Sequence, residues 1–121
     1  MIALAKTMKD ADLCGFFDFI GTLPPVPSPA PATPPDMARM SQGQALAQQH
    51  RCTFCHGPDL AGGQQVPRIG GQKEDYLRAT LRGFKSGDQP GYARAMTEAL
   101  SQVPVEDLDL LAYYVANFTG K

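Results

Sequence analysis

The amino-acid sequence predicts a small all-α protein, and three observations support this prediction. Segments 73–85 and 104–118 place apolar side chains three and four positions apart, which is the spacing of one buried helix face. No segment shows the alternation of apolar and polar residues that a half-buried strand requires. The 121 residues are 43% hydrophobic, which is enough for one small core. We therefore expect one helical domain with appended segments.

The expected elements follow one another around a long loop. Segment 38–50 has a short apolar run among glutamines and predicts a modest first helix. Segment 57–71 has five glycines and two prolines and no apolar periodicity, which predicts a loop; a loop of this length usually has a function. The helix in 73–85 places these side chains on one stripe: Tyr76, Leu77, Thr80, Leu81 and Phe84. The last helix should begin at Pro104, which suits a first helical position, and should bury Leu108, Leu111, Ala112, Val115 and Phe118.

A proline-rich stretch divides the chain into three parts. Seven prolines lie between Pro24 and Pro35, interleaved with small residues, and this composition favours an extended polyproline conformation. At roughly 3.1 Å per residue, such a linker would span on the order of 35 Å. We therefore expect an amphipathic helix in 1–23, a linker in 24–36 and the main domain in 37–121.

The N-terminal part repeats the pattern of the C-terminal helix. A shift of 95 positions aligns Met1 with Met96 and Asp12 with Asp107. It also aligns five apolar pairs: Leu13 with Leu108, Phe16 with Leu111, Phe17 with Ala112, Ile20 with Val115 and Leu23 with Phe118. Any two amphipathic helices can be aligned in this way, and a full-length repeat is absent. The coinciding methionines and acidic residues nevertheless favour a remnant of a preceding, similar domain.

Composition and charge exclude several classes of partner. A formal net charge of −1 gives no general attraction to phosphate, so neither nucleic acid nor an anionic lipid surface is expected. No apolar run approaches the ~20 residues of a membrane helix. The first 20 residues carry Asp10, Asp12 and Asp18 where an export signal would be apolar. The expected partner is another soluble protein.

The string Cys52-Thr53-Phe54-Cys55-His56 is the CxxCH pattern of covalent haem c attachment. Two thiols on one tight helical turn can add to the two vinyl groups of a porphyrin, and the adjacent imidazole can bind the iron. A thioredoxin-like redox pair would need a βαβ context, which this sequence lacks. A zinc site would need further ligands, and only Cys14 and His50 remain. The motif therefore predicts one haem c.

The second iron ligand must come from the opposite side of the ring. Met96 follows the motif by forty residues and is the only methionine after it. A thioether is a soft ligand that raises the reduction potential relative to a second imidazole; the alternative is a core methionine that fills space. His50 lies too close to Cys52 to reach the opposite face and is interpreted as a surface or helix-end residue. Cys14 is expected to be a buried or half-buried thiol.

These residues resemble the class I cytochrome c family, within it the c-four-like group of bacterial haem domains that often occur in pairs. The resemblance covers about Ser41 to Phe118. It rests on Gly43, CTFCHG at 52–57, VPRIGGQ at 66–72, YLRATLRGFKSG at 76–87, Met96 and LLAYY at 110–114.

The resemblance implies further roles for individual residues. Gly43 would let the first helix cross the last one near Leu110 and Tyr113 or Tyr114. The carbonyl of Pro67 would accept a hydrogen bond from the outer nitrogen of His56, although a simple loop proline is equally compatible with the sequence. Three side chains would donate to the haem propionates: Arg68, Gln72 and Tyr76.

With His56 and Met96 on the two faces of the ring, the iron would have no open position for a substrate. The expected function is therefore electron transfer rather than catalysis. Attachment of haem c resembles an extracytoplasmic process, so the expected location is the periplasm. Two alternatives stay open: a haem subunit or domain of a larger dehydrogenase or oxidase complex, and a five-coordinate haem that senses a ligand.

Overall fold

A computed structural model describes residues 2–24, 26, 29–88 and 94–120. Within them the chain is helical, and the sole β-type pairing is an isolated bridge between Gly63 and Val66. The predicted all-α class is therefore confirmed. The helices are α1 (Ile2–Ala5), α2 (Asp10–Thr22), α3 (Met37–Gln49), α4 (Cys52–His56), α5 (Glu74–Ser86), α6 (Arg94–Leu100) and α7 (Val105–Ala116).

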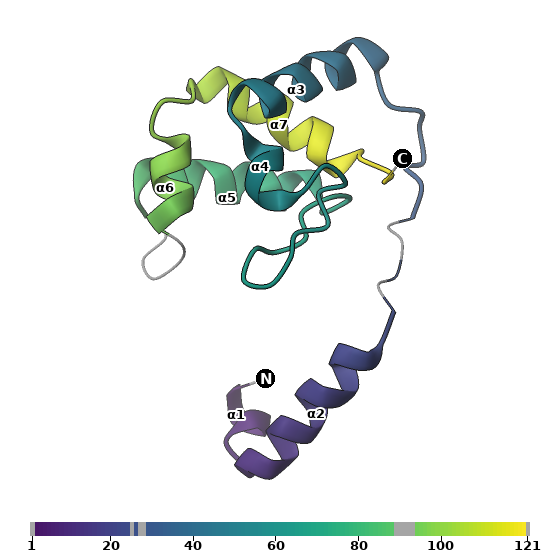
Figure 1. Ribbon diagram of the computed structural model, residues 1–121, viewed down its shortest axis with the longest axis vertical. Helices are drawn as coiled ribbons and strands as arrows, with labels where there is room; N and C mark the ends of the chain where they lie inside the picture. The colour runs from purple at the N-terminus through teal and green to yellow at the C-terminus, as the bar shows by residue number, and fades with distance from the viewer. Residues whose placement is uncertain (1, 25, 27–28, 89–93, 121) are drawn as a thin grey trace.

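Helices α3 and α7 cross at the top of the bundle (Figure 1). Gly43 of α3 faces Leu110 and Tyr114 of α7 at this crossing. A Cβ atom on Gly43 would lie 2.7 Å from the carbonyl oxygen of Leu110 and would also collide with the Cβ of Tyr114. Real Cβ atoms do not approach other atoms so closely, so the crossing requires glycine. The close contact expected near Leu110 and Tyr114 is confirmed.

Helix α5 packs against α7 and contributes to the core. Leu77 of α5 is buried against the apolar face of α7, as the periodicity predicted. The buried residues of α7 are Leu108, Leu111, Ala112, Tyr114 and Val115. Pro104 is the residue before the first turn of α7 rather than within it. Phe118, which was predicted to be buried in this helix, follows its end and is half-buried; its ring packs edge-on against Tyr114 with the centroids 5.8 Å apart.

Tyr76 and Cys14 are exposed, contrary to the predicted pattern. Tyr76 is 59% exposed, although its spacing placed it on the apolar stripe of α5. It precedes Leu77 by one residue, so a helix turns it about 100° away from the buried direction. Cys14 is exposed, and the prediction of a buried or half-buried thiol is therefore wrong.

Cys14 is exposed because α2 does not pack against another helix. Helices α1 and α2 lie apart from the bundle, beyond the linker, and neither contacts another helix (Figure 1). No described residue in either of them is buried. The apolar side chains of α2 thus remain open to solvent, among them Phe16, Phe17 and Ile20. Within the described residues, no helix combines the length and apolarity needed to cross a bilayer.

Candidate haem site

Helix α4 carries the CxxCH motif on little more than one helical turn. Helix α3 ends at Gln49, and Arg51 adopts a left-handed conformation with φ of 56°, which turns the chain sharply into α4. Residues three positions apart share one side of a helix, so Cys52 and Cys55 lie on the same side. Cys52 is half-buried against the core, whereas Cys55 is exposed. The pair therefore marks the edge between the core and the solvent.

The two cysteines are free thiols in this structure. Burial raises the pKa of the Cys52 thiol above its ordinary value, although a backbone hydrogen bond works in the opposite direction. The nucleophilic cysteine of a thioredoxin-like pair has a lowered pKa instead, and the described residues lack the strands of a βαβ context.

His56 ends α4 and is buried, with 6% of its surface exposed. Its Nδ1 atom lies 3.0 Å from the carbonyl oxygen of Pro67. With the proton on Nδ1, the ring donates to this carbonyl and keeps the lone pair of Nε2 for a metal. This is the contact that the resemblance implies. An imidazole next to two thiols on one turn is the donor set that a covalently attached haem requires.

The loop between α4 and α5 brings Pro67 back to His56. The amide of Gly62 donates to the carbonyl of His56 at 2.8 Å, and Gly63 and Val66 exchange two backbone hydrogen bonds. Leu60 is completely buried and anchors the loop in the core. The prediction of a loop is confirmed. The burial of Leu60 and the Gly62 hydrogen bond were not predicted, and the single leucine in a glycine-rich segment was the available signal for Leu60.

Met96 lies in α6, half-buried, and packs against the buried core. Core packing alone is the ordinary role of a methionine, and the structure shows this packing. The segment that precedes α6, residues 89–93, lies outside the described residues. Met40 of α3 also packs against this core, whereas Met37 is 74% exposed.

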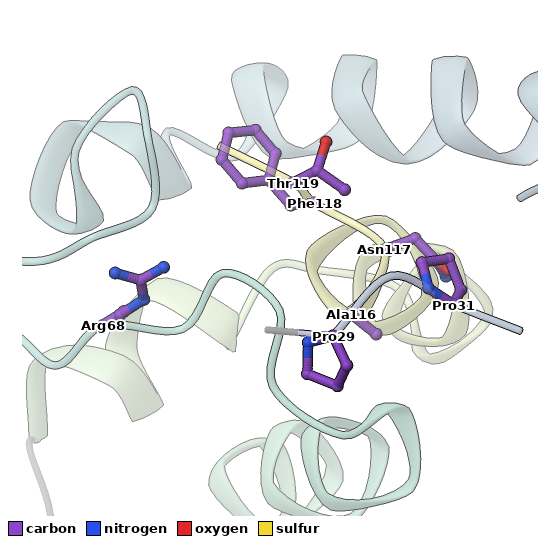
Figure 2. Close-up of a pocket in the computed structure, with 7 residues that line it drawn as sticks. All are labelled: Pro29, Pro31, Arg68, Ala116, Asn117, Phe118 and Thr119. Carbon is purple, nitrogen blue, oxygen red and sulfur yellow. The ribbon is translucent and has the colours of Figure 1, made fainter. Parts of the chain in front are cut away.

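The three residues expected to meet the propionates are all exposed. Arg68 lines a shallow pocket between the linker and the end of the chain, together with Pro29, Pro31, Ala116, Asn117, Phe118 and Thr119 (Figure 2). The Oε1 atom of Gln72 accepts a hydrogen bond from the amide of Lys73 at 2.9 Å. Tyr76 lies in the first turn of α5. Arg68 and Gln72 thus lie on the segment that carries Pro67, and Tyr76 follows it.

His50 follows α3 as its C-terminal cap, as expected of a helix-end residue, but it is half-buried. Its Nε2 atom lies 3.7 Å from Oδ2 of Asp107, which is within ion-pair range but too long for a hydrogen bond. Among the described residues, no three or more His, Cys, Asp or Glu side chains are grouped so as to hold a bare metal ion. The described residues therefore do not provide the ligand set of a zinc site.

Several known proteins are similar to this chain in sequence. The family model for cytochrome c matches residues 40–119. The thiosulfate dehydrogenase electron acceptor of Thiomonas intermedia is 29% identical over 84% of this chain and 54% of its own length. Cytochrome c4 of Azotobacter vinelandii is 33% identical over 65% of this chain and 40% of its own. This chain thus spans about half the length of these two relatives.

The fold is shared with a solved structure. Cytochrome c4 of Acidithiobacillus ferrooxidans superposes with a TM-score of 0.72 at 21% identity, and the match covers 97% of this chain and 69% of that one. At this identity the likeness establishes the fold. The family model covers the CxxCH motif, the loop that holds His56 and the crossing of α3 with α7. The chain therefore belongs to the cytochrome c family of electron-transferring haem proteins.

Proposed function

We propose that this chain carries electrons between partner proteins on one haem c, which is held by Cys52 and Cys55 and ligated by His56 and Met96. One observation carries the proposal. His56 is buried directly beside the cysteine pair, and its Nδ1 is already engaged by the Pro67 carbonyl at 3.0 Å. A histidine held in this way has one tautomer and one orientation, which is what an iron ligand needs.

Each residue of the site has a separate task. The thioethers formed by Cys52 and Cys55 would prevent loss of the cofactor, and the half-buried position of Cys52 would set one ring edge against the core. The haem, when bound, supplies an iron that changes its charge by one electron. The Met96 thioether would favour the ferrous state and so raise the reduction potential.

Arg68, Gln72 and Tyr76 would orient the cofactor from the solvent side. Haem propionates are anionic and need hydrogen-bond donors, which an arginine, an amide and a phenol provide. All three side chains are exposed, and two belong to the segment that ends at α5. The Arg68 side chain is exposed and lines a pocket, where its guanidinium is accessible to an anion (Figure 2).

The proposed setting is the periplasm, with a dehydrogenase as electron donor. The donor class follows from the relative of Thiomonas intermedia, whose name describes an electron acceptor of thiosulfate dehydrogenase. A periplasmic location is also compatible with the alternative function, in which the chain is a haem subunit or domain of a larger dehydrogenase or oxidase complex.

Helices α1 and α2 are proposed to be the closing helices of a preceding haem domain, with 24–36 as linker and 37–121 as the present domain. Under a shift of 95 positions, the end of α6 at Leu100 falls on the end of α1 at Ala5. The start of α7 at Val105 falls on the start of α2 at Asp10. Three apolar residues of α2 are exposed, Phe16, Phe17 and Ile20, whereas their counterparts in α7 are buried, Leu111, Ala112 and Val115. Helix α2 thus displays a face whose equivalent in α7 is covered.

Absorption spectra of the oxidised and reduced protein test the proposed function. We expect the spectrum of a six-coordinate haem c and a reversible one-electron change. In Met96→Ala the sulfur-to-ferric-iron band should disappear and the potential should fall, whereas the control Met40→Ala, another methionine packed against the core, should keep both. An unchanged spectrum and potential in Met96→Ala would refute the ligand assignment. A wild-type spectrum without that band would favour the ligand-sensing alternative.

A further inference from the structure

Gly62 occupies a constrained backbone position in the loop next to the histidine. Its φ angle is +70°, a conformation that residues with a side chain rarely adopt. A Cβ atom at this position would lie 2.6 Å from the carbonyl carbon of Pro67 and 2.7 Å from its oxygen, and would also collide with the carbonyl oxygen of Val66. These are backbone atoms, so no side chain can rotate away to make room.

The same residue is tied to both partners of the His56 contact. Its amide donates to the carbonyl of His56 at 2.8 Å. A Cβ on Gly62 would collide with the carbonyl group of Pro67, whose oxygen lies 3.0 Å from Nδ1 of His56. Gly62 therefore fixes the main chain of the histidine and, at the same time, the distance of the carbonyl that faces its ring.

We propose that Gly62 is a positioning residue for the iron ligand, because only a residue without a side chain lets the Pro67 carbonyl reach the ring of His56. The consequence for the iron rests on the proposed function above. A Cβ at this position would displace the Pro67 carbonyl and weaken its hydrogen bond from Nδ1. The imidazole would then give less electron density to the iron, which destabilises the ferric state and raises the reduction potential.

Two other glycines provide matched controls. Gly63 is the next residue in the same loop, and a Cβ there would meet no atom within 4 Å. Gly87 has a φ of +81°, but its Cβ would also point into open space. Gly63→Ala thus tests the substitution itself, Gly87→Ala tests the cost of a positive φ angle, and Gly62→Ala adds the collision with Pro67. Gly62→Asn keeps the collision in a residue type that tolerates positive φ better.

The experiment measures two properties of the haem-loaded variants: the exchange rate of the His56 ring proton by NMR, and the reduction potential. Weakening one hydrogen bond should speed the ring-proton exchange roughly two- to tenfold in both Gly62 variants. Their potentials should move upward, while Gly63→Ala and Gly87→Ala stay at the wild-type values. Gly62 variants that match the controls in both properties would overturn the proposal, and so would an equal change in Gly87→Ala.

If the Gly62 variants do not fold, hydrogen exchange in the wild-type protein tests the proposal. Both the amide proton of Gly62 and the ring proton of His56 should be protected from exchange, and free exchange of either one would overturn the proposal. Different results refute the proposed function and the role of Gly62. A wild-type protein without covalent haem refutes the proposed function, whereas a haem-loaded wild type whose Gly62 variants resemble the controls refutes only the role of Gly62.

Discussion

Replacing Gly43 with alanine should lower the melting temperature of the domain by roughly 10 °C. The new Cβ would lie 2.7 Å from the Leu110 carbonyl oxygen and would collide with the Cβ of Tyr114. Both atoms belong to the α7 backbone or lie directly on it, so helices α3 and α7 must separate to relieve the overlap. Overpacking of this kind costs about 3 kcal/mol, and the better helix propensity of alanine returns about 1 kcal/mol.

The net loss in the free energy of unfolding is therefore about 2 kcal/mol, and for a domain of this size each kcal/mol shifts the melting temperature by about 4–8 °C. Thermal unfolding followed by circular dichroism measures the shift. Gly15→Ala is the matched control, since Gly15 is also within a helix but a Cβ there meets nothing within 4 Å. A Gly43→Ala variant that melts at or above the wild-type temperature would refute the inferred crossing.

Two further substitutions test the elements that support the site. Leu60→Ala removes a side chain that is 0% exposed, so the free energy of unfolding should fall by about 2–4 kcal/mol in a denaturant titration; a loss below about 1 kcal/mol would show that Leu60 does not anchor the loop. Asp36→Ala removes the side-chain acceptor of the Ala38 and Arg39 amides at the start of α3 and should cost about 1 kcal/mol. Asp36→Asn should retain most of that stability, and equal losses in both variants would contradict a capping role.

Apolar periodicity in the sequence was sufficient to predict the helices whose apolar faces pack against the core. In α7 the buried residues Leu108, Leu111 and Val115 recur at helical spacing. In α5 the buried residue is Leu77, which belongs to the predicted apolar stripe. Local periodicity reports such faces because each of them packs against another helix. The same reasoning failed for Cys14, since the apolar pattern of α2 presupposes a partner that the structure does not provide.

The attachment motif could also be predicted, because its three residues lie on one turn and need no tertiary information. The geometry around His56 could not be predicted from local pattern. The Pro67 contact depends on backbone hydrogen bonds across the loop and on the left-handed conformations of Leu60 and Gly62. Only the family resemblance pointed to Pro67, and nothing in the sequence pattern distinguished Gly62 from its neighbour Gly63.

The most direct test of the central claim is the intact mass of the protein under denaturing conditions, after expression with export to the periplasm and a haem-attachment system. The wild-type chain should have the mass of the polypeptide plus one haem, since only a covalent adduct survives denaturation. The double variant Cys52→Ala/Cys55→Ala should have the polypeptide mass alone, whereas Cys14→Ala should keep the haem. A wild-type mass without the adduct would contradict the proposed function.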